Sequence, residues 1–239
     1  VTWAADKGIE KGRKVRIDST PVEANIHNPT DDSLLADLVR VICRTLKKAG
    51  LPKTFSFRDR RKVAKRLSFR ISQAGEPRDR RRLYNRLLSE SRDIYQEALA
   101  IATRLDQARL DLRNKLMYWL DMLQRVIEQT WQRVILGKRL PASQKIVSVF
   151  ETHADILAKD NRQTIFGHKV CLTGGPSCMI TDCIIEAGNP PDSLLAPKMI
   201  VRHEGIFGHL PRQAAYDGFR LPLQPWRHQG LRRIRRGLP

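Results

Sequence analysis

The sequence has 239 residues, 41% of them hydrophobic, which is enough chain for one large domain or for one domain carrying an insertion. Lys and Arg number 44 against 25 Asp and Glu, and the formal net charge of +19 favours nucleic acid as the partner, ahead of a membrane surface. No apolar run approaches the roughly 20 residues that span a bilayer, and the N-terminus lacks the layout of a signal peptide.

We therefore expect a cytoplasmic protein that is not associated with a membrane. The cysteines Cys43, Cys171, Cys178 and Cys183 show no paired Cys-x-x-Cys spacing. A zinc site and a disulfide framework are both disfavoured, and we expect these side chains to be small apolar residues in a reduced compartment. The chain starts at Val1 without a Met, which fits a start inside a longer protein.

Residues 1–12 are predicted to be the end of a helix, with Gly8 and Gly12 as breakers. A strand follows, in which Val15 and Ile17 alternate with Arg16 and Asp18. We expect Pro21 to limit how far its regular pairing continues. A carboxylate at the end of a strand suits metal binding, although Asp18 could also cap a turn or pair with an Arg.

The segment 21–33 is rich in turn-forming residues and contains His27, either as a ligand or as an ordinary loop hydrogen-bonding group. Thr30 or Asp31 can cap the helix that comes next. That helix is predicted from an apolar stripe at helical spacing, formed by Leu34, Leu35, Leu38, Val39 and Ile42.

Between Lys47 and Arg92, sixteen Lys or Arg side chains face only four acids. Such an excess predicts contact with a phosphate backbone that salt would weaken, and the alternative is a merely solvated surface. The basic runs supply the candidate DNA-binding residues Arg58, Arg60, Arg61, Lys62, Arg80, Arg81 and Arg82.

No Gly or Pro occurs between Pro77 and Gly137, where apolar residues recur at helical spacing. One unbroken helix would reach roughly 80 Å, so a bend or a helical hairpin is expected. The aromatic residues of this region are predicted to be core and not base-stacking groups: Tyr84, Tyr95, Tyr118, Trp119 and Trp131.

After Gly137 the pattern changes to short β-like runs at 145–150, 166–173 and 179–185, the last two joined by a hairpin turn at 174–177. A helix at 194–203 and a strand at 213–218 follow. Asp217 ends that strand, so a second strand-end carboxylate can meet Asp18 on a neighbouring strand of one mixed sheet. Asp182 is predicted to be a surface residue.

Five short motifs occur in order along residues 1 to 219: RIDST at 16–20, NIHNPTD at 25–31, FGHKV at 166–170, GNP at 188–190 with Asp192, and AYDG at 215–218. Together they resemble motifs of the DDE transposases of bacterial insertion sequences. The resemblance implies an α/β fold with a ribonuclease H-like mixed sheet, interrupted by a large all-helical insertion. The core would comprise 1–30 and 140–219, and the basic insertion 31–139.

In that family three acids hold two Mg²⁺ ions for cleavage and transfer of DNA strands. By position, Asp18 matches the first acid and Asp217 the second, as catalytic residues and metal ligands. His168 and Lys169 either contact phosphate near the site or are structural. The resemblance implies DNA, as insertion-sequence ends and target, for the partner, and leaves a homo-oligomer on DNA open.

The chain departs from the family pattern after Asp217, where no Asp or Glu remains to supply the third acid. The tail 220–239 has six Arg and three Pro, and we expect it to be irregular and basic. With suitable codons, removal of one base lets the same nucleotides read ASRSNLGDTKAFGGFGVAF, which predicts a frameshift after Phe219 and an inactive fragment. The alternatives are a non-catalytic basic DNA-binding remnant and an unrelated helical nucleic-acid-binding protein.

Overall fold

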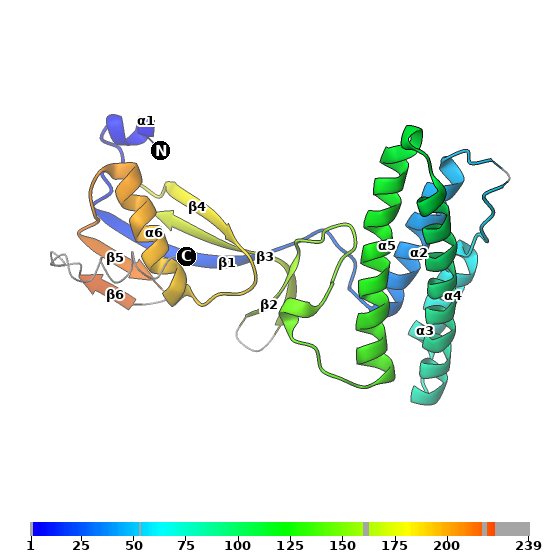
Figure 1. The fold of residues 1–239 in the computed structure, drawn as a ribbon. Coiled ribbons are helices and arrows are strands. Elements are labelled where there is room, and N and C mark those ends of the chain that lie inside the picture. Colours follow the sequence, from blue (N-terminus) through cyan, green and yellow to red (C-terminus); the bar gives the residue numbers. More distant parts are fainter. Residues whose placement is uncertain (1, 53, 160–162, 217–218, 223–239) are drawn as a thin grey trace. The chain divides into compact units, whose positions relative to one another are not determined.

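The chain divides into two compact units, which are described separately (Figure 1). The computed structural model describes residues 2–52, 54–159, 163–216 and 219–222. Val1–Ala24 and His153–Pro239 form the sheet unit, and Asn25–Thr152 form the helical unit. The sequence placed the ends of the helical segment at 31 and 139. The prediction of an α/β protein with a mixed sheet is confirmed.

The sheet unit contains one mixed sheet in the order β2-β3-β1-β5-β6, with β4 also pairing with β3. All strand pairs are antiparallel except β1 with β5, which run parallel. The predicted hairpin between the strands now labelled β3 and β4 is confirmed. The strands are β1 Lys14–Glu23, β2 Asp155–Lys159, β3 Gln163–Gly174, β4 Ile180–Glu186, β5 Gln213–Tyr216 and β6 Phe219–Pro222.

Two helices belong to this unit, the short α1 (Thr2–Asp6) and α6 (Asp192–Phe207), the second longer than predicted. α6 crosses one face of the sheet (Figure 1). On this face Met199 packs among apolar residues of the strands. The buried cluster comprises Val15, Ile17, Cys171, Leu195, Ala196, Met199 and Ala214. Gly12 has φ +60°, and a Cβ there would lie 2.5 Å from the Phe207 ring, so only glycine fits beside α6.

The helical unit contains α2 (Asp31–Lys48), α3 (Arg61–Gln73), α4 (Pro77–Arg104) and α5 (Leu110–Thr130), followed by a π-helical turn (Trp131–Ile135). The predicted helical hairpin is confirmed, since α4 and α5 pack together and the chain turns through a short 3₁₀ segment at Gln107–Arg109. Thr30 caps α2 by accepting a hydrogen bond from the Ser33 amide, as the sequence predicts.

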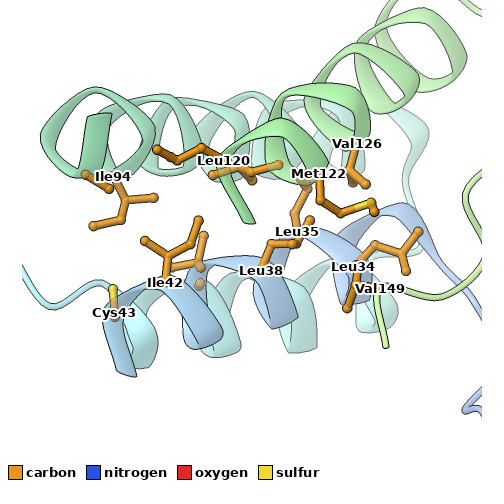
Figure 2. Packing of buried hydrophobic residues seen from close by; sticks show 14 of the residues in the cluster. Leu34, Leu35, Leu38, Ile42, Cys43, Ile94, Leu120, Met122, Val126 and Val149 are labelled. Atoms are coloured by element: carbon orange, nitrogen blue, oxygen red, sulfur yellow. The ribbon is translucent and has the colours of Figure 1, made fainter. Parts of the chain in front are cut away.

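The core of the helical unit lies between α2 and the α4–α5 hairpin. Figure 2 shows Leu38 and Ile42 of α2 facing Ile94, Leu120 and Val126 of the hairpin. The predicted stripe on α2 is fully buried, as are the apolar residues of the hairpin that it meets. Among the predicted core aromatics Tyr84 is buried, whereas Tyr118 is half exposed and does not belong to the core.

The prediction of a strand at 145–150 is wrong, because this segment forms no strand. The side-chain amide of Gln129 takes the place of a neighbouring strand. Its Oε1 accepts from the Ile146 amide at 2.7 Å, and its Nε2 donates to the Ile146 carbonyl at 3.2 Å. The apolar alternation instead buries Val149 in the helical core. The strand β2 was not predicted.

Two further expectations need correction. Pairing of β1 with β3 continues past Pro21, which lies opposite Lys169, to Glu23. Proline is tolerated there because the described partner on the other edge of β1 ends at Ile17, so the missing N–H belongs to an edge without a ladder. The tail predicted to be irregular from residue 220 begins with β6, which pairs with β5.

Candidate functional site

Asp18 lies on β1 with its carboxylate on the sheet face away from the α6 cluster, since the alternate residues Val15 and Ile17 face α6. The carboxylate is 63% exposed and accepts a hydrogen bond from Arg16 at 3.2 Å. This is the pairing with an Arg that the sequence left open. An exposed carboxylate with a single exposed partner remains accessible to a ligand from solvent.

β5 brings its carboxyl end to the same region of the sheet. It pairs in parallel with β1, from Lys14 opposite Gln213 to Ile17 opposite Tyr216. Asp217 follows Tyr216 in the sequence but lies outside the described residues, so its proximity to Asp18 stays a prediction.

Two other acids of the sheet unit, Asp182 and Asp192, are engaged in pairs. Asp182 accepts two hydrogen bonds from Arg202, at 2.6 and 2.8 Å, and these lower the pKa of Asp182. Asp192, at the start of α6, accepts from Ser19 at 2.5 Å. Burial alone would raise the pKa of Asp192, but the bonds from Lys169 and Ser19 outweigh it and the pKa is lowered. These pairs tie α6 to the sheet.

The structure places Lys169 in that scaffold. Its ammonium lies 2.8 Å from Asp192 and donates to the Pro190 carbonyl at 2.6 Å, and its side chain is only 13% exposed. His168 stacks on His153, with ring centroids 4.8 Å apart. Lys169 therefore has a structural role, and its contact with phosphate stays a prediction.

The described residues do not by themselves fit the two-metal site that the resemblance implies. Within 2–52, 54–159, 163–216 and 219–222, no three or more His, Cys, Asp or Glu side chains come together to hold a metal ion. Asp18 supplies one hard oxygen ligand, whereas a pair of Mg²⁺ ions requires several.

The basic stretch from Lys47 to Arg92 contains both buried and surface cations. Arg60 is 5% exposed, and its guanidinium meets Glu90 at 3.2 Å and Glu97 at 2.7 Å. Burial alone would raise the pKa of Glu97, but hydrogen bonds from Arg60 and from the Arg58 amide outweigh it and the pKa is lowered. Arg60 is thus held inside the helical unit, away from the surface that the sequence assigned to it.

The other predicted cations lie at the surface to different degrees. Arg61 is bound to Asp59, and these hydrogen bonds lower the pKa of Asp59 to about 2. Arg80 and Arg81 donate to the carbonyls of Ala74 and Ile135. The remaining predicted residues, Arg58, Lys62 and Arg82, are exposed, and no carboxylate lies within 4 Å of their charged groups among the residues described.

A pocket of about 880 Å³ opens between α2 and α3. Five cations of the pocket come from these two helices, Arg40 and Arg44 from α2 and Arg61, Lys62 and Lys65 from α3. We call it the basic pocket; its lining is His27, Ser33, Ala36, Asp37, Arg40, Arg44, Asp59, Arg61, Lys62, Lys65, Ser68 and Phe150.

The loop residue His27 lies at this pocket, with its Nε2 3.7 Å from Asp37, which also accepts from Arg40 at 2.6 Å. Sequence reasoning missed Arg40, Arg44 and Lys65 as site residues. The spacing of Arg40 and Arg44 by four positions, within a helix whose apolar stripe was already recognised, was the signal that could have found them.

The cysteines are all free among the residues described, and Cys43 and Cys171 are buried as expected. Burial raises the pKa of the Cys171 thiol to about 11. Cys178 and Cys183 are also free but lie exposed at the surface.

No protein-family model, curated protein or solved structure matches the chain. In the part of the chain that is described, each helix is too short or too polar to cross a membrane.

Proposed function

We propose that this chain is a fragment of an insertion-sequence DNA transposase with a ribonuclease H-like core. The proposed activity is cleavage and transfer of DNA strands by the sheet unit. The observation that carries the proposal is the order of the sheet around β1. An antiparallel meander of β1, β3 and β4 is followed by α6, and β5 then returns parallel to β1 on its free side.

This order supports the proposal because it places β5 directly beside β1, although the two strands are nearly 200 residues apart in the sequence. Asp18 is the first residue of β1 beyond its described pairing with β5. It therefore lies where a carboxylate from the end of a neighbouring parallel strand would complete an acidic site. An exposed carboxylate on a rigid central strand is suited to hold a reacting group in a fixed orientation.

The ion pairs around α6 support a positioning role for the neighbouring residues. Lys169, Ser19 and Asp192 join β3, β1 and the first turn of α6. They fix the helix that covers the face opposite Asp18. Through this helix they would hold the strands in register beneath the proposed site.

A second candidate is a non-catalytic DNA-binding remnant. This candidate is favoured because the described carboxylates near Asp18 are too few to complete a metal site. It is also compatible with the net charge of +19. Both candidates bind DNA, so cleavage chemistry separates them.

We further propose that this chain is inactive on its own because the reading frame shifts after Phe219. The tail 220–239 carries six Arg and no acid, so it cannot contribute a third carboxylate. Sequencing the gene across codons 217–239 tests this directly. We expect the other frame to stay open and to encode a helix with a Glu, and an early stop codon in that frame would contradict the frameshift.

The activity is tested on the chain with the frame restored. We expect Mg²⁺-dependent cleavage of duplex DNA that is abolished by Asp18→Asn. Glu23→Gln is the matched control, because Glu23 is another exposed carboxylate of β1 and should leave cleavage intact. Equal cleavage by the wild type and Asp18→Asn would refute the proposed site. DNA binding without cleavage by any of these chains would favour the remnant.

A further inference from the structure

The basic pocket has an excess of positive charge that the protein does not neutralise. Of its cations, Arg40 pairs with Asp37 and Arg61 pairs with Asp59. Arg44, Lys62 and Lys65 are exposed, and no ion pair or hydrogen bond involves their charged groups among the described residues. Three full positive charges therefore remain on one side of the helical unit.

These three charges face a shared space and do not point to separate regions of solvent. Arg44 comes from the second half of α2, whereas Lys62 and Lys65 come from the first turns of α3. All three line the same 880 Å³ pocket. Like charges around one pocket give it a positive potential, so the arrangement favours an anionic ligand.

The dimensions favour a chain of anionic groups over a single ion. The pocket is lined along α2 from Ser33 to Arg44, which is about 16 Å at the usual rise of an α-helix. Cations occur one turn apart on each helix, at 40 and 44 and at 62 and 65. A nucleic-acid strand presents charges at intervals along such a length, whereas one free phosphate would meet only part of the lining.

The aromatic residue of the pocket adds a second type of contact. Phe150 is 50% exposed, and the Arg40 guanidinium lies 5.6 Å from the centre of its ring. Arg40 is thereby held at the pocket by the ring on one side and by Asp37 on the other. Phe150 thus gives the pocket an exposed aromatic surface beside its cations.

We propose that the basic pocket binds the phosphodiester backbone of a nucleic acid, with Arg44, Lys62 and Lys65 as the phosphate contacts. This site belongs to the helical unit alone. It differs from the surface that the sequence suggested, because Arg60 is buried and Arg44 and Lys65 take part. It does not depend on any chemistry at Asp18.

The test measures the affinity of the full chain for a short mixed-sequence duplex, for one of its single strands and for inorganic phosphate. The pocket variant is Lys62→Ala with Lys65→Ala. The matched control is Arg113→Ala with Lys115→Ala, which removes two exposed cations of α5 outside the pocket. Lys62→Arg with Lys65→Arg restores the charge. Circular dichroism and thermal melting verify that each variant is folded.

Each phosphate contact contributes about 0.9 to the slope of log affinity against log salt for duplex DNA. The pocket variant should therefore lose a slope of about 1.8. Between about 50 and 200 mM salt, its affinity should fall roughly tenfold less than that of the wild type. The Arg variant should restore the slope, and the α5 control should keep it.

The nucleic acid whose salt slope changes identifies the source of the phosphates. A slope difference with the duplex or with the single strand supports the inference and identifies the form that enters the pocket. Equal slopes for the pocket variant and the α5 control would overturn it. A change in phosphate affinity with no change for either nucleic acid would also overturn it, because the pocket would then be a simple anion site. Cleavage by the sheet unit is measured separately, so binding at the basic pocket and the proposed cleavage can be refuted independently.

Discussion

The two units of this protein handle buried polar groups in different ways. The helical unit places several acids inside and satisfies them: Asp31 accepts from Arg133 and Gln129, and Asp32 accepts from Tyr84 and Ser68. The sheet unit instead pairs Asp182 and Asp192 with cations of other elements, and its apolar cluster at α6 is smaller. Buried polar networks fix a unique packing only when every member is satisfied.

The difference has a consequence for where function can reside. In the helical unit the core is closed by α2 and the α4–α5 hairpin, and the surplus cations are left on the outside. In the sheet unit one face of β1 is used for packing and the other holds an exposed acid. The proposed binding of a polyanion and the proposed chemistry at Asp18 would thus depend on separate units.

The largest expected effect comes from removing the central cation of the helical network. Arg60→Ala would leave Glu90 and Glu97 without their partner, and removing one member of a buried ion pair typically costs about 3–5 kcal/mol. We expect the helical unit to unfold at a lower denaturant concentration, as measured by far-UV circular dichroism. Arg61→Ala is the control, because its pair with Asp59 lies at the surface, where ion pairs contribute little to stability. Similar losses for both variants would contradict the distinction between buried and surface cations.

A smaller effect is expected from the apolar cluster beneath α6. Met199 is fully buried between α6 and the strands, and Met199→Ala should destabilise the sheet unit by about 2 kcal/mol, at the low end of the range for such truncations. Leu38→Ala makes the matching truncation in the helical core. Hydrogen exchange should show loss of protection in β1 and β3 for the first variant and in α2 for the second. Loss throughout the chain in both cases would show that the two units unfold together.

The smallest effect concerns pH. His203 is 2% exposed, and burial lowers its pKa although its Nε2–H donates to the Gly12 carbonyl at 2.8 Å. The unfolded chain binds a proton near pH 6.5 while the folded chain stays neutral to lower pH. Stability should therefore fall as pH drops below about 6.5, by at most about 1.4 kcal/mol per pH unit, until the lowered pKa is reached. Urea unfolding at pH 7.5 and 5.5 measures this, and His203→Gln should flatten the dependence at the sheet unit.

Helices were predictable because their signals are local. The stripe from Leu34 to Ile42 and the cap at Thr30 lie within a few residues of each other, and both are observed. The prediction for 145–150 was wrong because its apolar and polar residues alternate as in a strand. Its backbone is instead hydrogen-bonded to a side chain of α5. The burial of Arg60 could not be foreseen, since it depends on Glu90 and Glu97 about 30 residues later. The basic pocket likewise required the packing of α2 on α3.

The parallel pairing of β1 with β5 also determines when the sheet can form. Val15 lies opposite Ala214, so this part of the sheet cannot close until most of the chain has left the ribosome. The helical unit, Asn25–Thr152, precedes β3 and β5 in the chain and can fold during that interval. An unpaired strand is prone to association with other chains while it waits. Pro21 and the charged residues Lys14, Arg16 and Asp18 along β1 disfavour such pairing, and they protect the strand during synthesis.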